Sequence, residues 1–143
     1  MPSLVRRYLK TAFVFMLVGT LLGALMSVSQ GLLGRSVPYP LIVAHAHALL
    51  VGFVLMLIIG VATWMFPRPS REDTRYRPEL AETIYWIMTL ATVLRFGGEV
   101  AGAYWPRRSL SLLSAMGGLG QALASFLFVY NMWTRVRAPS GGS

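Results

Sequence analysis

The two histidines of the chain, His45 and His47, are separated by a single residue within the apolar stretch VAHAHALLVG. An α-helix turns by about 100° per residue, so side chains two positions apart point roughly 200° away from each other. A regular helix therefore cannot direct both imidazoles at one metal ion. If both are ligands, they serve two sites on opposite faces of their helix.

The metal chemistry open to this chain is narrow because the sequence contains no cysteine. Disulfides, iron–sulfur clusters and thiolate metal sites are thereby excluded. Zinc wants about four converging ligands, which two divergent histidines do not supply. Haem iron takes only one or two axial ligands from the protein, so haem suits the pair better. The alternative is two interfacial polar residues bonded to backbone or water, but ionisable groups inside a membrane usually have a task.

A pair of adjacent arginines, Arg107 and Arg108, falls in the short connection WPRRS. The planar guanidinium group matches carboxylates in charge and geometry, and haem carries two propionates. The neighbouring Trp105 and Tyr104 are candidates to pack on a haem edge. Two alternatives stay open: the arginines are solvated charges or headgroup anchors, and the aromatic residues are ordinary interfacial side chains.

Four apolar blocks must position these residues, at about 11–33, 41–66, 80–104 and 109–133. Each block is long enough to cross about 30 Å of hydrocarbon as a helix, and the connections are short. The chain is also 55% hydrophobic and only 13% charged. We therefore predict an all-α membrane protein, an up-down bundle of four transmembrane helices within residues 1–134, followed by a disordered tail at 135–143.

The distribution of basic residues predicts how the bundle is oriented. They cluster before the first block, between the second and third blocks and after the fourth, which places that side and both termini in the cytoplasm. The net charge of +8 is attributed to this topology, and no nucleic-acid partner is expected. Within the third block, Arg95 and Glu99 lie one helical turn apart, either as a self-contained ion pair or as part of a quinol site.

Three of the four blocks resemble one known family. VAHAHALLVGFVLMLIIGVATWMFP resembles the tenth helix of haem-copper oxidase subunit I, which carries a His-x-His followed by glycine, tryptophan and proline. The loop YWPRRS resembles the Pro-Arg-Arg loop between the last two helices of that subunit. The block SLSLLSAMGGLGQALASFLFVYNMW is similar to its final helix, and all three occur in the same order.

The resemblance implies roles for particular residues. The position of His45 binds the high-spin haem of the family and that of His47 the low-spin haem, while Arg107 and Arg108 match the arginines that bind propionates. The family's copper ligands lie on another helix, and this chain has no third histidine. No copper is therefore expected, and whether the chain is an enzyme stays open.

The resemblance also implies self-association. Subunit I looks like three four-helix arcs around a pseudo-threefold axis, and this chain resembles one arc. A homotrimer would rebuild the arrangement, with a homodimer as the alternative. In the trimer, His45 of one protomer and His47 of the next would clamp one haem, most simply of the b type.

Two imidazoles on one iron give a low-spin haem suited to electron transfer. We therefore expect an electron-transfer protein of a bacterial or archaeal plasma (inner) membrane, in contact with lipid, with its own copies and with a quinol or redox partner protein. One alternative is binding or sensing of NO, CO or O₂ at an open iron position. Another is a non-catalytic assembly subunit of a larger oxidase.

Overall fold

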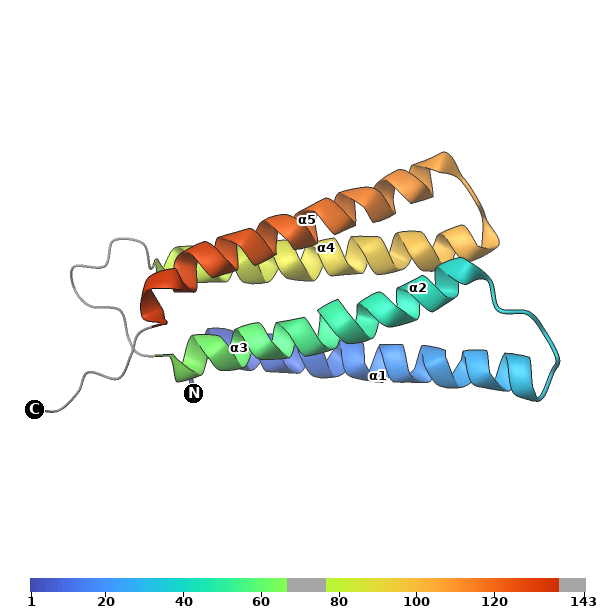
Figure 1. Ribbon diagram of the computed structural model, residues 1–143, viewed down its shortest axis with the longest axis horizontal. Coiled ribbons are helices and arrows are strands. Elements are labelled where there is room, and N and C mark those ends of the chain that lie inside the picture. The colour runs from blue at the N-terminus through green and yellow to red at the C-terminus, as the bar shows by residue number, and fades with distance from the viewer. Residues whose placement is uncertain (67–76, 137–143) are drawn as a thin grey trace, which may run out of the picture.

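Four long helical rods make up the part of the chain that the computed structural model describes, residues 1–66 and 77–136 (Figure 1). The first rod is α1 (Ser3–Gly31), and the second joins α2 (Tyr39–His47), η1 (Ala48–Leu55) and α3 (Met56–Met65). The third and fourth rods are α4 (Pro78–Tyr104) and α5 (Arg108–Met132), followed by the 3-10 turn η2 (Trp133–Arg135). The described residues contain no strand, so the all-α prediction is confirmed for them.

The predicted blocks match the rods in number and order, with differences at their ends. The largest concerns α1, which begins at Ser3, although its apolar block begins at about Thr11. Apolar composition marks the part of a helix suited to hydrocarbon, whereas helical backbone bonding continues through the segment 6–10, which contains three basic residues. The other three rods begin one or two residues earlier than predicted. Pro40 lies in the first turn of α2 and Pro78 in that of α4, where proline is tolerated.

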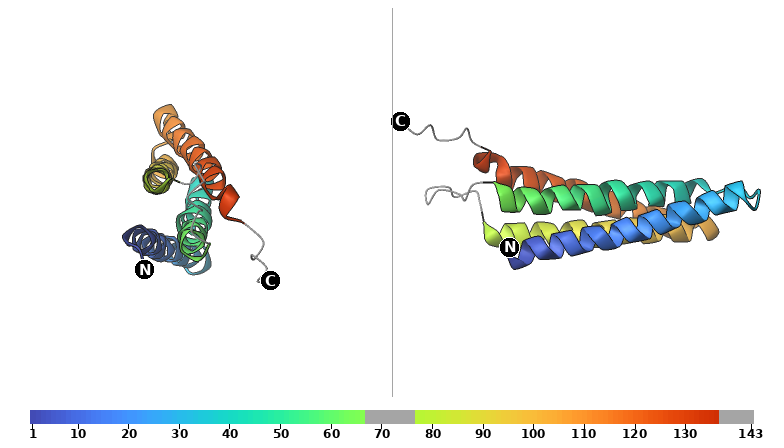
Figure 2. Two further views of the ribbon diagram at one scale, coloured as in Figure 1. Left: turned by 90° about the vertical axis from the view of Figure 1, so that its left-hand side faces the viewer. Right: turned by 90° about the horizontal axis from the view of Figure 1, so that it is seen from below.

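Successive rods run in alternating directions and pack mainly on their neighbours in the chain (Figure 1). α1 packs along η1 and α3, α2 packs against α4, and α4 packs along α5. α5 has little direct packing with the second rod. The end-on view in Figure 2 shows α5 inclined to α4, and the two rods diverge toward the end where residues 105–107 connect them. The chain-order packing leaves one side of α1 and one side of α5 without a neighbour from the described chain.

The best-packed part of the core lies toward the end where α1 begins. Tyr8 and Met56 are completely or almost completely buried there, at 1% and 0% exposure. The rings of Tyr8 and Tyr85 meet edge-on with centroids 5.0 Å apart, and the hydroxyls of Tyr85 and Thr11 are 2.9 Å apart. Met56 and Ile59 of the second rod belong to the same buried cluster, which therefore joins α1, the second rod and α4. The opposite end of the molecule contains the N-terminus of α2 and the two grooves that are described with the candidate site.

A π-helical segment interrupts the second rod directly after His47. η1 covers Ala48–Leu55, and the N–H of Met56 at its end donates to the carbonyl of Val51, five residues earlier. Gly52 lies in this segment against α1, and a Cβ built on it would come within 2.5 Å of Phe15 Cγ. The sequence pattern did not predict this segment. π-helical turns widen a helix locally and are frequent at functional sites.

Three of the rods have the length and composition of membrane-crossing helices: α1, the composite rod Tyr39–Met65, and α5. The membrane character predicted for the chain is confirmed for these three. α4 does not meet the same criterion, and it contains the charged residues Arg95 and Glu99. A membrane-crossing α4 and a cytoplasmic position of both termini stay predictions.

The end of α5 is tied back to the end of α3. Arg135, which we placed in the tail, belongs to η2 and is only 4% exposed. Its Nη2 donates to the carbonyl of Phe66 at 2.6 Å. The ordered chain therefore continues beyond residue 134, and residues 137–143 of the predicted tail lie outside the described part.

Candidate haem-binding site

His45 faces α1 from the last turn of α2. Its Nδ1–H donates to the carbonyl of Gly19 at 2.9 Å. The contact requires close approach of the two helices, and Gly23 permits it, because a Cβ built on Gly23 would lie 2.6 Å from His45 Cε1. The backbone of α1 thus fixes both the hydrogen bond and the orientation of this imidazole.

A groove of about 520 Å³ lies beside His45, between α1 and α2. Its walls combine apolar side chains, among them Met26, Ile42 and Leu49, with small polar ones such as Thr20 and Ser27. Such a mixture suits the edge of a large, mostly apolar cofactor.

His47 faces α4 on the other side of its helix. Its Nδ1–H donates to the carboxylate of Glu99, 3.2 Å from Oε1 and 3.3 Å from Oε2. The side chain of His47 is 23% exposed and that of Glu99 only 9%. The same carboxylate accepts a second bond from Nε of Arg95 at 3.0 Å.

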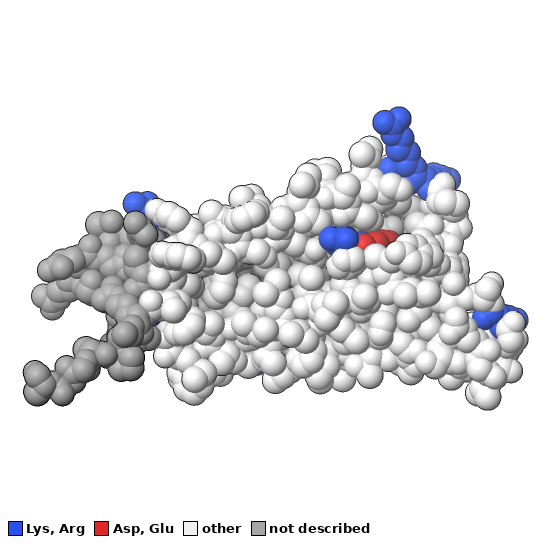
Figure 3. Space-filling model, in the orientation of Figure 1, with Lys and Arg blue, Asp and Glu red and all other residues white. Residues whose placement is uncertain are grey.

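The hydrogen bonds continue from Arg95 to α5. Nη1 of Arg95 donates to Oε1 of Gln121 at 3.2 Å, and Nε2 of Gln121 donates to Oγ1 of Thr92 at 3.2 Å. Gly117 lets α5 approach this closely, because a Cβ built on it would lie 2.7 Å from the Cβ of Arg95. A chain of polar contacts therefore joins α2, α4 and α5. On the face drawn in Figure 3, charged atoms lie at the ends, with one basic–acidic pair on the uncharged stretch between them.

The two imidazoles satisfy a simple test for haem ligands. They point to opposite faces, as helix geometry predicted, His45 toward α1 and His47 toward α4. Both use Nδ1–H as a donor, since a carbonyl and a carboxylate can only accept, and this leaves the Nε2 lone pair of each ring for a metal. Ligating histidines in proteins almost always have their second nitrogen fixed in this way. The donor set therefore fits axial ligation of haem.

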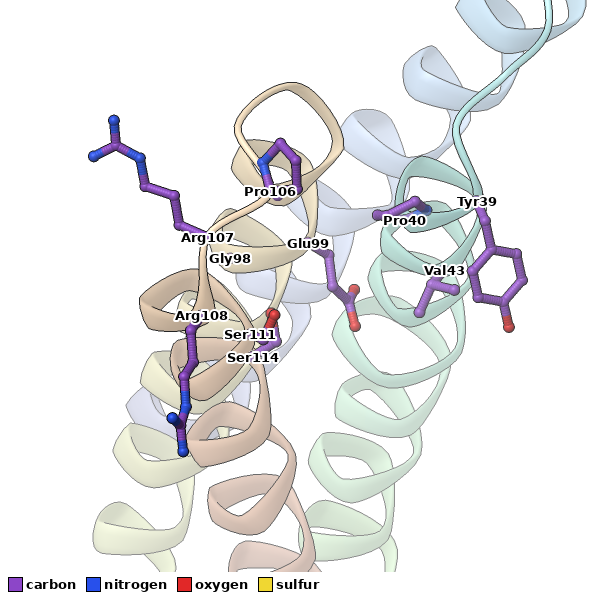
Figure 4. A pocket seen from close by; sticks show the side chains of 11 residues that line it. Tyr39, Pro40, Val43, Gly98, Glu99, Pro106, Arg107, Arg108, Ser111 and Ser114 are labelled. Atoms are coloured by element: carbon purple, nitrogen blue, oxygen red, sulfur yellow. The ribbon is translucent and has the colours of Figure 1, made fainter.

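Arg107 and Arg108 lie at the start of α5, the first as its N-cap and the second as its first residue. Both line a groove of about 540 Å³ between α2, α4 and α5, and Glu99 contributes to its lining. Figure 4 shows Glu99 directed into the space facing α2, whereas the guanidinium groups of Arg107 and Arg108 point away from it. The structure thus places the arginines at the histidine end without bringing them onto either imidazole.

Trp105 caps the C-terminus of α4 and is 64% exposed. It is not part of the lining of either groove described above, and its ring packs at a tilt on Tyr104 with centroids 6.2 Å apart. The propionate role of the arginines and the haem-edge role of Trp105 therefore stay predictions.

Copper needs a different donor set. Within residues 1–66 and 77–136, no three His, Cys, Asp or Glu side chains converge as a metal site would need. The expectation that copper is not bound remains a prediction from the histidine count.

The family model for cytochrome c and quinol oxidase polypeptide I matches residues 3–141. The chain belongs to this family. The predicted relationship to haem-copper oxidase subunit I is thereby confirmed over nearly the whole chain, including the first rod. Comparison of the chain with curated proteins and with solved structures found no match.

Several partners of the histidines escaped sequence reasoning. For Arg95 and Glu99 the sequence left open a self-contained ion pair or part of a quinol site. The two do pair, but Glu99 also accepts from His47 and Arg95 also donates to Gln121. A glutamine in the middle of an apolar block was the available signal for the α5 contact. The acceptor of His45 is a backbone carbonyl, which no side-chain pattern reveals.

Proposed function

We propose that this chain binds haem through His45 and His47 and transfers electrons in the membrane. The observation that carries the proposal is the fixed Nδ1–H of each imidazole, bonded to Gly19 on one face and to Glu99 on the other. Each Nε2 is then preset for an axial bond. Because the imidazoles face opposite ways, one chain cannot direct both at one iron.

The two ligands of each iron then come from different protomers. His45 of one copy and His47 of the next clamp a haem, of the b type, in a homotrimer, with a homodimer as the alternative. Packing in chain order supports this assembly, since it leaves α1 and α5 with a side open to a neighbour. Haem, when bound, supplies reversible one-electron chemistry at its iron.

The other residues serve binding and orientation. Gly19 and Glu99 hold the imidazole rings in place. Arg107 and Arg108 are exposed at the same end and carry the charge that propionates require. We place the protein in a bacterial or archaeal plasma membrane, with α4 as a fourth span and a quinol or a redox protein as electron partner.

An absorption spectrum of the detergent-purified protein, with its haem-to-protein ratio, tests the proposal. We expect about one haem per chain, following from cyclic closure, and sharp low-spin bands that CO leaves unchanged. A CO-induced shift would instead indicate an open iron position and favour gas binding. Protein that carries no haem would overturn both readings and favour an assembly subunit of a larger oxidase.

A further inference from the structure

The carboxylate of Glu99 is the centre of the polar contacts between α2 and α4. It accepts hydrogen bonds from the His47 imidazole at 3.3 Å, on Oε2, and from the Arg95 guanidinium at 3.0 Å, on Oε1. The side chain is 9% exposed, and it lies on the same helix as Arg95, one turn away. Burying a charged group among apolar helices costs free energy, so such groups are usually paired and often have a functional role.

A second ion pair, which joins Arg7 of α1 to Glu82 of α4, provides the contrast. Arg7 and Glu82 are 2.8 Å apart near the other end of the molecule, with side chains 38% and 50% exposed. Water screens such a pair, so it contributes little to stability and exerts little field on distant groups. The pair of Arg95 and Glu99 is less screened, and the carboxylate acts directly on the imidazole that it contacts.

The effect of that contact on His47 has a definite direction. A carboxylate that accepts Nδ1–H orients the ring, fixes its tautomer and makes Nε2 a stronger electron donor. A stronger, more anionic donor stabilises ferric over ferrous iron and so lowers the reduction potential. The neutral carbonyl of Gly19 exerts a weaker effect of this kind on His45, because it carries no net charge.

Resting on the proposed haem function, we infer that Glu99 is a positioning residue that holds His47 and lowers the reduction potential of the iron that His47 binds. Arg95 sets the size of the effect, because its guanidinium neutralises part of the carboxylate charge. Gln121 holds Arg95 from α5. The fourth rod is thereby coupled to a ligand that it does not touch.

A potentiometric titration of full-length, haem-loaded protein in detergent tests the inference, with Glu99→Gln compared against Glu82→Gln. Glu99→Gln keeps an acceptor of the same shape and removes the charge. We expect it to retain six-coordinate haem and to favour ferrous iron roughly tenfold more, a rise of about 59 mV for one electron. Glu82→Gln, the same change on the same helix, should match the wild type. A Glu99→Gln potential equal to that of Glu82→Gln would overturn the inference.

Arg95→Gln gives the opposite sign. Without the guanidinium, the full carboxylate charge acts on His47, so the midpoint potential should fall below that of the wild type. A general disturbance of packing would move the potentials of both variants in one direction. A rise in Arg95→Gln would therefore overturn the role assigned to charge.

Loss of haem from Glu99→Gln would be resolved by Glu99→Asp, which keeps the charge on a shorter side chain. Retention of haem by Glu99→Asp at a potential near the wild-type value would support the inference. Loss from both variants would assign Glu99 to folding and overturn it. Wild-type protein without haem would overturn the proposed function itself, whereas haem-loaded wild type with an unshifted Glu99→Gln overturns the inference alone.

Discussion

His45 and His47 stand two positions apart on one helix, yet different parts of the molecule hold them. On the α1 side, His45 meets a backbone carbonyl and lies on the bare backbone of Gly23. On the α4 side, His47 meets a buried carboxylate that belongs to a network of side chains. The first environment depends on shape and the second on charge. Substitutions that change side-chain volume should therefore affect mainly the His45 side, and substitutions that change charge mainly the His47 side.

The largest effect is expected from removing either imidazole. His45→Ala and His47→Ala should each abolish six-coordinate haem, because every site in the shared-ligand assembly uses one of each. Electron paramagnetic resonance and the reduced absorption spectrum measure this directly. A full complement of six-coordinate haem in either single variant would refute the shared arrangement.

Added volume should break the α1 side selectively. The Cβ of Gly23→Ala would lie 2.6 Å from the imidazole of His45, so the ring or α1 must shift. We expect a destabilisation of about 1–3 kcal/mol, the usual range for overpacking, together with weakened haem retention. Thermal unfolding monitored through the haem band measures both.

Gly97 offers the matched control for that substitution. It lies within α4, and a Cβ built on it would meet no atom within 4 Å. Gly97→Ala should be neutral or stabilise by roughly 0.5–1 kcal/mol, because alanine loses less backbone entropy in a helix. Equal losses in the two alanine variants would show that the loss at Gly23 does not come from contact with His45.

A smaller effect is expected at the far end of the α4 side. Gln121→Leu removes the bonds that join Arg95 and Thr92 to α5, and an interhelical hydrogen bond in a membrane averages about 0.6 kcal/mol. Haem coordination should persist, since Arg95 still holds Glu99. Ser125→Ala, whose hydroxyl bonds only a carbonyl of its own helix in the described contacts, is the control. A loss of six-coordinate haem in Gln121→Leu alone would show that the network is more tightly coupled to His47 than its geometry indicates.

The smallest effect is expected from the arginines, which contact neither histidine. Arg107 is exposed, so Arg107→Ala should weaken haem retention by about 0.5 kcal/mol, the scale of an exposed ion pair, and leave the axial ligands in place. Haem release to an excess of a haem-binding acceptor protein measures this change. A variant with altered coordination would contradict the assignment of this residue to the propionates.

Helix periodicity and apolar composition are local properties, and for that reason they predicted much of this molecule. The four rods appear in the expected order, and the divergence of His45 and His47 follows from the helical turn alone. The family relationship rested on three short motifs and extends over residues 3–141. The start of α1 was misjudged, because apolarity ends before the helix does.

Only the tertiary structure decided what each imidazole contacts. Gly19, Glu99 and Gln121 lie 26, 52 and 26 positions from their respective partners His45, His47 and Arg95. Their meeting depends on how far each rod is rotated and how closely glycines let the rods approach. The π-helical segment after His47 was likewise visible only in the structure, because a hydrophobic pattern does not reveal a local change in helical turn. Sequence therefore determined that the two imidazoles face opposite ways, and packing decided that one is held by a backbone carbonyl and the other by a carboxylate.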